Sequence, residues 1–185
     1  MPEGSKQAAI LIATSFQAMN RAAEGRRDTL VSDATVMILF AGFYLEATLN
    51  YIAEATGNAP TMVKLLKKPF PGLQDKLGWF YNSFVAKKKA STRKQLYQWG
   101  IEAKLRRKFP GFAELYKFRN DISHGRINKC AASLQTANRL RNNAKSIVAA
   151  LYTITSKTGH PVSRIPTYQE AIAHFTNVNP TARCS

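Results

Sequence analysis

The sequence has little cysteine and little histidine, which excludes several classes of protein. Its 185 residues include two cysteines, Cys130 and Cys184, too few for a disulfide framework and not in the paired spacing of a zinc site. The three histidines, His124, His160 and His174, are far apart in the sequence and form no zinc-binding motif. We therefore expect no metal or other cofactor, and a reducing, cytoplasmic setting.

The chain also lacks a long apolar segment. The strongest apolar run, residues 36–45 (VMILFAGFYL), is about half of the roughly 20 residues that a membrane span needs. We expect a buried helix there instead. Near the N-terminus, Glu3 stands where a signal peptide carries basic residues, and polar residues soon interrupt the apolar stretch. The sequence therefore predicts a protein without a membrane partner.

Acidic residues are scarce compared with basic ones. Eleven Asp and Glu stand against 27 Lys and Arg, a formal net charge of +16. A compact domain with this charge repels itself, and a polyanion partner, most often nucleic acid, is the usual reason for it. The alternative is that the lysines solubilise exposed helix faces. The basic clusters are Lys64, Lys67 and Lys68; Lys87, Lys88 and Lys89 with Arg93 and Lys94; Arg106, Arg107 and Lys108; and Arg126 with Lys129.

Apolar residues recur at helical spacing along almost the whole chain. With 45% hydrophobic residues, we expect a single domain over 1–185 with its core at about 33–155. No segment alternates as a strand does, so the predicted fold is all-α: an up-and-down bundle of four to five core helices plus short helices. Helices are expected over 5–23, 33–56, 75–87, 91–110, 111–125, 131–157 and 167–176, with one short helix in the loop 57–74.

The apolar stripes of the first and last long helices are expected to face the core. In residues 5–23 the stripe is Ala8, Leu11, Ile12, Phe16 and Met19. In residues 131–157 it is Leu134, Ala137, Leu140, Ala144, Ile147, Val148 and Leu151.

Three polar residues stand together near the end of the helix predicted over 111–125. Arg119 precedes Asn120, and His124 follows four positions after Asn120, so Asn120 and His124 can point the same way. An arginine fork suits phosphate oxygens and stays charged, and an imidazole can give or take a proton near neutral pH. The group could therefore bind a phosphate and act on it.

The segment Arg119-Asn120-x-x-x-His124 resembles the motif of the HEPN superfamily. It follows an apolar-aromatic helix (FAELYKF) and precedes both Gly125 and a long final helix, and residues 38–57 resemble the first core helix of such bundles. The resemblance covers about 33–155. It implies an all-helical homodimer with two motifs facing each other, which in many members is a metal-independent endoribonuclease acting as a toxin or defence effector.

The resemblance also implies a role for each motif residue. Arg119 would hold the scissile phosphate, His124 would transfer protons, and Asn120 would orient one of them or the RNA. An antitoxin or other regulatory protein is an expected partner, but Arg126 replaces the tyrosine that some antitoxins modify. Other members only bind ligands, so the second hypothesis is a non-catalytic module for RNA, a nucleotide or a partner protein.

RNA suits this chemistry because each phosphate lies beside its own nucleophile, the 2′-hydroxyl, which DNA lacks. Cleavage needs a base for that hydroxyl, an acid for the leaving oxygen and a cation for the phosphorane. One histidine does not readily serve as both acid and base, whereas a symmetric dimer supplies two. Candidate contacts to the RNA backbone are Arg106, Arg107, Arg126 and Lys129.

Other interpretations of the same residues are open. His124 could be a solvated or capping residue, and Arg119 could form a structural ion pair with Glu46 or Glu114. Glu46 and Asn50, four residues apart, could orient Arg119 or His124, or they could belong to an exposed polar stripe. A third hypothesis is a basic helical protein whose match to the motif is accidental.

Overall fold

The computed structural model describes residues 3–24, 33–66, 71–87, 92–126 and 133–160, and this part of the chain is all-helical, as predicted. A π-helical turn, η1 (Tyr81–Val85), continues one of the helices. The helix predicted over 167–176 lies outside the described residues. The helices are α1 (Glu3–Ala23), α2 (Asp33–Ala55), α3 (Ala59–Leu66), α4 (Leu73–Phe80), α5 (Arg93–Gln98), α6 (Ile101–Lys108), α7 (Phe112–Ser123) and α8 (Leu134–Ser156).

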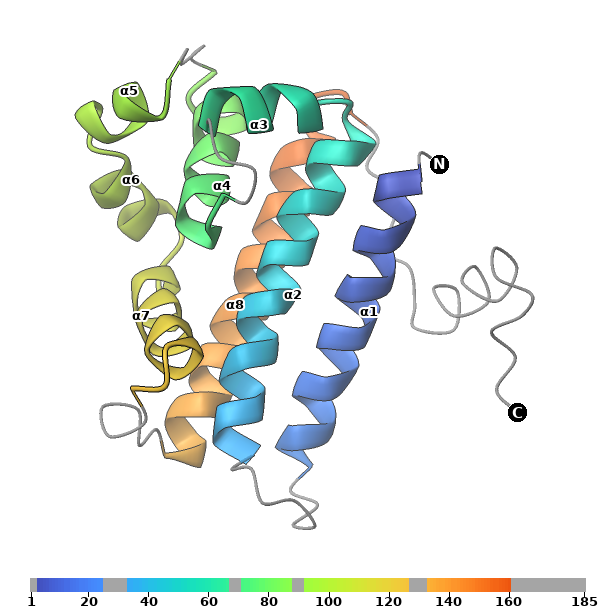
Figure 1. Ribbon diagram of the computed structural model, residues 1–185, viewed down its shortest axis with the longest axis vertical. Coiled ribbons are helices and arrows are strands. Elements are labelled where there is room, and N and C mark those ends of the chain that lie inside the picture. The colour runs from blue at the N-terminus through green and yellow to red at the C-terminus, as the bar shows by residue number, and fades with distance from the viewer. Residues whose placement is uncertain (1–2, 25–32, 67–70, 88–91, 127–132, 161–185) are drawn as a thin grey trace.

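The long helix α2 is the centre of the bundle. It packs against α1 on one side, against α8 behind it, and against α4 and α7 on the remaining side, while α3 lies across one end (Figure 1). The short helices α5 and α6 lie outside α4, and α6 leads into α7. Every helix that carries a predicted site residue therefore either is α2 or lies beside it, except α6.

The long helices run alternately in opposite directions along the chain, as in an up-and-down bundle, although short helices replace one long helix between α2 and α8 (Figure 1). α1 and α2 are antiparallel, and so are α7 and α8 (Figure 1). The central neighbours α2 and α8 run in the same direction because both begin at the same end of the bundle. The chain between them is divided into short helices by residues such as Gly100 and Gly111, both with positive φ, so no single long helix returns beside α2. The homodimer stays a prediction.

The composition of α2 follows from its central position. A helix that is apolar on all sides must be surrounded, and residues on every face of α2 are buried. By length and composition alone, α2 could cross a membrane, but 67% of its most apolar 18-residue segment is buried in the bundle. The helix predicted over 36–45 is largely buried, although Val36, Leu39 and Phe40 are half-buried and Phe43 is 40% exposed.

Three of the apolar residues expected in the core are exposed instead. Leu11 and Phe16 of α1 are 54% and 39% exposed, and Leu134 at the start of α8 is 50% exposed. α1 packs against α2, and its buried apolar residues are Ala9, Ile12, Ala13, Met19 and Ala22. The remaining residues predicted for the α8 stripe are all buried.

One helix predicted over 91–110 is two helices, because Gly100 interrupts it. Gly100 has a φ of +65°, a conformation that glycine adopts without a steric penalty, and this ends α5 and redirects the chain into α6. Thr92 caps α5, since its side chain accepts a hydrogen bond from the backbone N–H of Gln95 at 3.3 Å. The break lets α6 contact both α4 and α7.

Leu45→Ala should destabilise the fold, whereas Leu11→Ala should not. Leu45 is fully buried in α2, and truncating such a leucine costs about 2–5 kcal/mol through lost burial and a residual cavity. Leu11 is 54% exposed, so we expect its truncation to cost less than about 0.5 kcal/mol. Urea unfolding followed by circular dichroism measures both. Equal losses for the two variants would contradict the burial of Leu45 and the exposure of Leu11.

Candidate functional site

A Schellman motif ends α7 and places His124 at the exposed end of the helix. Gly125 has a φ of +67°, its N–H donates to the carbonyl of Ile122 at 3.0 Å, and the N–H of Arg126 donates to the carbonyl of Asp121 at 2.9 Å. His124 is the C-cap residue, and its own N–H donates to the carbonyl of Asn120. The imidazole is exposed and makes no hydrogen bond within the described part of the chain.

Arg119 leaves α7 in the direction of α2. Its Nη2 lies 3.2 Å from Oε2 of Glu46, and its Nη1 donates to Oδ1 of Asn120 at 3.1 Å. The guanidinium carbon lies 5.5 Å from the ring centroid of Phe43, within the range of a cation–π contact. Because 21% of the Arg119 side chain is exposed, it is anchored in the bundle while part of it can be reached from solvent. The alternative ion pair with Glu46 is therefore formed.

The missing side chain at Gly42 allows Arg119 to lie across α2. A Cβ at Gly42 would come within 2.7 Å of Cγ of Arg119, so either residue would have to move. Glycine inside a helix lowers stability by about 0.5–1 kcal/mol relative to alanine. At Gly42 the same lack of a side chain lets α7 pack closely on α2. Our sequence reasoning missed Gly42, although an isolated glycine in a helical pattern is a known sign of a packing or functional role.

Glu46 is shared between two cations from different helices. Its Oε1 lies 2.8 Å from Nζ of Lys76 in α4, while Oε2 faces Arg119 in α7. The Lys76 side chain is 9% exposed and the Glu46 side chain 22%. Lysine is seldom this buried without a partner, so Glu46 accounts for its position. One carboxylate between two cations leaves this cluster with a net positive charge.

Of the two residues predicted to support the site, Glu46 and Asn50, only Glu46 is hydrogen-bonded to a motif residue. Glu46 contacts Arg119, whereas Asn50, one turn further along α2, makes no hydrogen bond to Arg119 or His124. Both are half-buried, so they do not form an exposed polar stripe. Glu114, the other acid considered for Arg119, pairs with Arg139 of α8 instead. Lys76 was not identified from the sequence, because no local pattern shows that α4 will meet α2 at Glu46.

The three motif residues share one end of α7, but a side-chain hydrogen bond joins only Arg119 and Asn120. Arg119 and His124 are five residues apart, which corresponds to about 7.5 Å along a helix axis. No hydrogen bond joins His124 to Arg119 or to the Asn120 side chain, and all three residues are described. The geometry thus provides an anchored guanidinium oriented by Asn120, and a solvent-exposed imidazole at the adjoining helix end.

The basic residues predicted to contact RNA are exposed where they are described. Arg106 and Arg107 lie in the last turn of α6, where cations also interact favourably with the helix dipole. Arg126, whose side chain is 61% exposed, has Nη1 at 3.4 Å from Oδ1 of Asp121. Arg106 also lines a pocket of about 300 Å³ between α6 and α7. Lys129 lies outside the described residues.

A second polar cluster connects α4 to α5. Oδ1 of Asp75 accepts hydrogen bonds from Arg93 Nε at 2.8 Å and from the Tyr97 hydroxyl at 2.7 Å. Burial, together with the hydrogen bond to Asp75, raises the pKa of Tyr97 to about 12, so this hydroxyl stays protonated and continues to donate. The cluster fixes α5 on α4. Among the described residues, no group of three His, Cys, Asp or Glu could hold a metal ion.

Glu46→Gln should destabilise the protein by about 1–3 kcal/mol, because it leaves Lys76 and Arg119 close together without an anion. This is less than the roughly 3–5 kcal/mol for breaking a fully buried pair, since Glu46 is partly exposed. Lys76→Met should partly rescue Glu46→Gln by removing one of the unpaired cations. Urea unfolding of the two single variants and the double variant measures the coupling. Strictly additive losses would show that the cluster does not exist in solution.

Comparison with known proteins gives no match: no protein-family model, no curated protein and no solved structure is significantly similar to this chain.

Proposed function

We propose that the protein is a metal-independent endoribonuclease of the HEPN type, with Arg119, Asn120 and His124 as its catalytic site. The observation that carries the proposal is that solvent can reach both the Arg119 and the His124 side chains at one end of α7. Arg119 is anchored by Glu46 with part of its side chain exposed, and the His124 imidazole is exposed beside the Schellman turn. A fixed cation next to an accessible proton carrier is what cleavage at an RNA phosphate requires.

Each residue has a defined part in the proposed reaction. The Arg119 guanidinium binds the non-bridging oxygens of the scissile phosphate and stabilises the phosphorane. Asn120 holds Nη1 of Arg119 through its Oδ1 and so fixes the plane of the guanidinium. His124 transfers protons, either from the 2′-hydroxyl or to the leaving 5′-oxygen. Glu46 is a positioning residue, because it contacts Arg119 and lies 22% exposed behind it.

The charge of the whole chain supports a polyanionic substrate. The formal net charge is +16, and the cluster of Arg119, Glu46 and Lys76 adds a local positive charge at the site. Exposed arginines at the end of α6, and Arg126 after α7, extend this charge on either side of the motif helix. Such contacts attract an RNA backbone without regard to its sequence.

His124→Ala should lower the cleavage rate of single-stranded RNA by about 10²–10⁴-fold, the usual contribution of a general acid or base. The assay contains EDTA, and a 2′-deoxy substrate of the same sequence should stay intact. His160→Ala is the matched control, since His160 is also an exposed histidine but lies beyond α8, near Phe84. Cleavage that persists in His124→Ala would remove His124 from the mechanism.

The alternative is a non-catalytic module of the same type that binds RNA, a nucleotide or a partner protein. It is favoured by the lack of any hydrogen bond between Arg119 and His124 in the described structure. RNA binding without cutting by either the parent protein or His160→Ala would support this alternative. The nuclease proposal also includes a cytoplasmic location and an antitoxin or other regulatory protein as a partner.

A homodimer belongs to the same proposal because two histidines can divide the acid and base roles. Phe43 is 40% exposed beside Arg119 and packs at 5.8 Å against the half-buried ring of Phe40. An exposed aromatic pair next to the site suits an interface that brings two copies of Arg119 together.

Phe43→Glu should convert the dimer to a monomer and lower cleavage, since a carboxylate would be buried against its own copy. Val63→Glu is the matched control, because Val63 is 45% exposed but lies on α3, at one end of the bundle. Size-exclusion chromatography with light scattering measures the mass of each variant. A parent protein that is monomeric at assay concentrations yet cleaves RNA would contradict the need for two histidines.

A further inference from the structure

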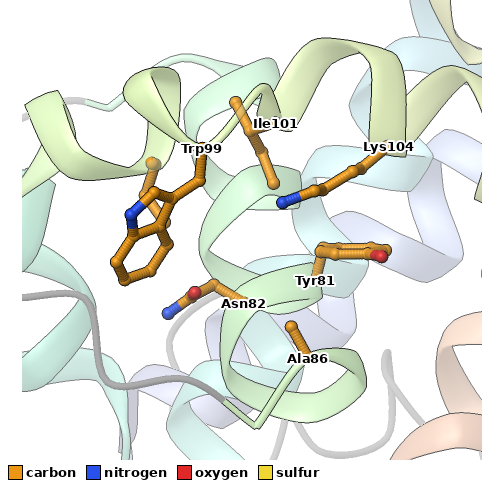
Figure 2. Close-up of a pocket in the computed structure, with 7 residues that line it drawn as sticks. Tyr81, Asn82, Ala86, Trp99, Ile101 and Lys104 are labelled. Atoms are coloured by element: carbon orange, nitrogen blue, oxygen red, sulfur yellow. The ribbon is translucent and has the colours of Figure 1, made fainter.

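A pocket of about 260 Å³ lies between η1 and the junction of α5 and α6, apart from the motif residues. Figure 2 shows Tyr81 and Lys104 on one side of the space and Trp99 and Asn82 on the other, with Ile101 closing one end. Two aromatic rings, one amide and one ammonium group therefore surround it. None of these side chains takes part in the Arg119 cluster.

Two irregularities of the backbone build this pocket. The π-helical turn η1 starts where α4 stops and carries Tyr81 and Asn82. Gly100, with its φ of +65°, separates Trp99 at the end of α5 from Ile101 at the start of α6. π-Turns cost hydrogen-bond regularity and occur frequently at functional sites. A continuous helix through either segment would carry these side chains in other directions.

The lining groups match the parts of an unstacked nucleotide. Aromatic rings contact the face of any base. An ammonium group attracts the adjoining phosphate. The volume, about 260 Å³, lies just below the range of about 300–1,000 Å³ typical of pockets for drug-sized ligands, so one base fits better than a stack of bases.

We propose that this pocket binds one unstacked base of single-stranded RNA, with Trp99 and Tyr81 at the base and Lys104 at the neighbouring phosphate. This inference rests on the proposed function for the identity of the polymer. It adds a base-binding subsite, whereas the arginines around the motif contact only the backbone.

A basic path connects the pocket with the motif helix. Lys104 lines the pocket from α6, and the last turn of the same helix carries exposed Arg106, Arg107 and Lys108. α7, with Arg119, follows α6 along the same side of the bundle (Figure 1). A backbone that lies along α6 can thus hold one base in the pocket while a phosphate further along reaches Arg119.

Tryptophan fluorescence tests the pocket directly. Of the two tryptophans, Trp79 is 1% exposed in the core, whereas Trp99 is half-buried at the pocket. Trp79→Phe combined with His124→Ala gives a protein with Trp99 as its single tryptophan and without the proposed proton carrier. It is titrated with hexamers of each ribonucleotide, with the four mononucleotides and with inorganic phosphate. We expect the hexamers to quench the emission, and phosphate to leave it unchanged.

Two pocket variants measure the contribution of the side chains to affinity. Trp99→Leu should weaken binding of a fluorescein-labelled hexamer roughly 5- to 150-fold, the usual effect of losing one base–aromatic stack. Lys104→Gln should weaken it by a smaller factor and reduce its dependence on salt. Lys157→Gln, an exposed lysine at the end of α8, should have little effect. If Trp99→Leu does not fold, the hexamer affinity of Lys104→Gln still tests whether the pocket binds RNA.

The outcomes separate this inference from the nuclease proposal. Quenching without RNA cleavage by the parent protein supports the pocket and refutes the nuclease. RNA cleavage by the parent protein with the same hexamer affinity in Trp99→Leu as in the parent refutes the pocket and leaves the nuclease intact. Equal affinity for mononucleotides and hexamers, or no quenching by any hexamer, overturns the assignment to RNA.

Discussion

The arrangement of the site depends on one carboxylate, Glu46, held between Arg119 and Lys76. It ties α7 and α4 to the central helix and so determines where the motif helix lies. The geometry requires a glycine at position 42, because any larger residue would displace the stem of Arg119. The cluster is therefore built from three helices that are far apart in the sequence, and Arg119 owes its orientation to the packing of the bundle.

The two ends of the proposed RNA path have different physical origins. At the motif, a regular helix ends in a Schellman turn that leaves His124 exposed. At the base pocket, a π-turn and a left-handed glycine interrupt regular helices and group aromatic side chains around a space. The helix between them, α6, supplies exposed cations. The proposal thus assigns attraction to phosphate and contact with a base to separate parts of one surface.

Local patterns were sufficient to locate most helices and the motif. Gly125 after an apolar helix predicts the end of α7, and the scarcity of strand-like alternation predicts an all-α chain. The same patterns misplaced Leu11, Phe16 and Leu134, because apolar spacing shows that a helix has an apolar face but not how much of it a neighbour covers. They also merged α5 with α6, since one glycine can be tolerated inside a helix.

The sequence by itself determined the helical class, the excess of positive charge and the position of Arg119, Asn120 and His124 at a helix end, because each follows from residues within a few positions of one another. Only the tertiary structure decided that Glu46 rather than Glu114 pairs with Arg119, that Lys76 joins them, and that Tyr81 and Trp99 share a pocket. Tyr81 and Trp99 are 18 positions apart in the sequence, and Glu46 and Arg119 are 73 positions apart. Helix packing brings such residues together, and no local periodicity encodes it.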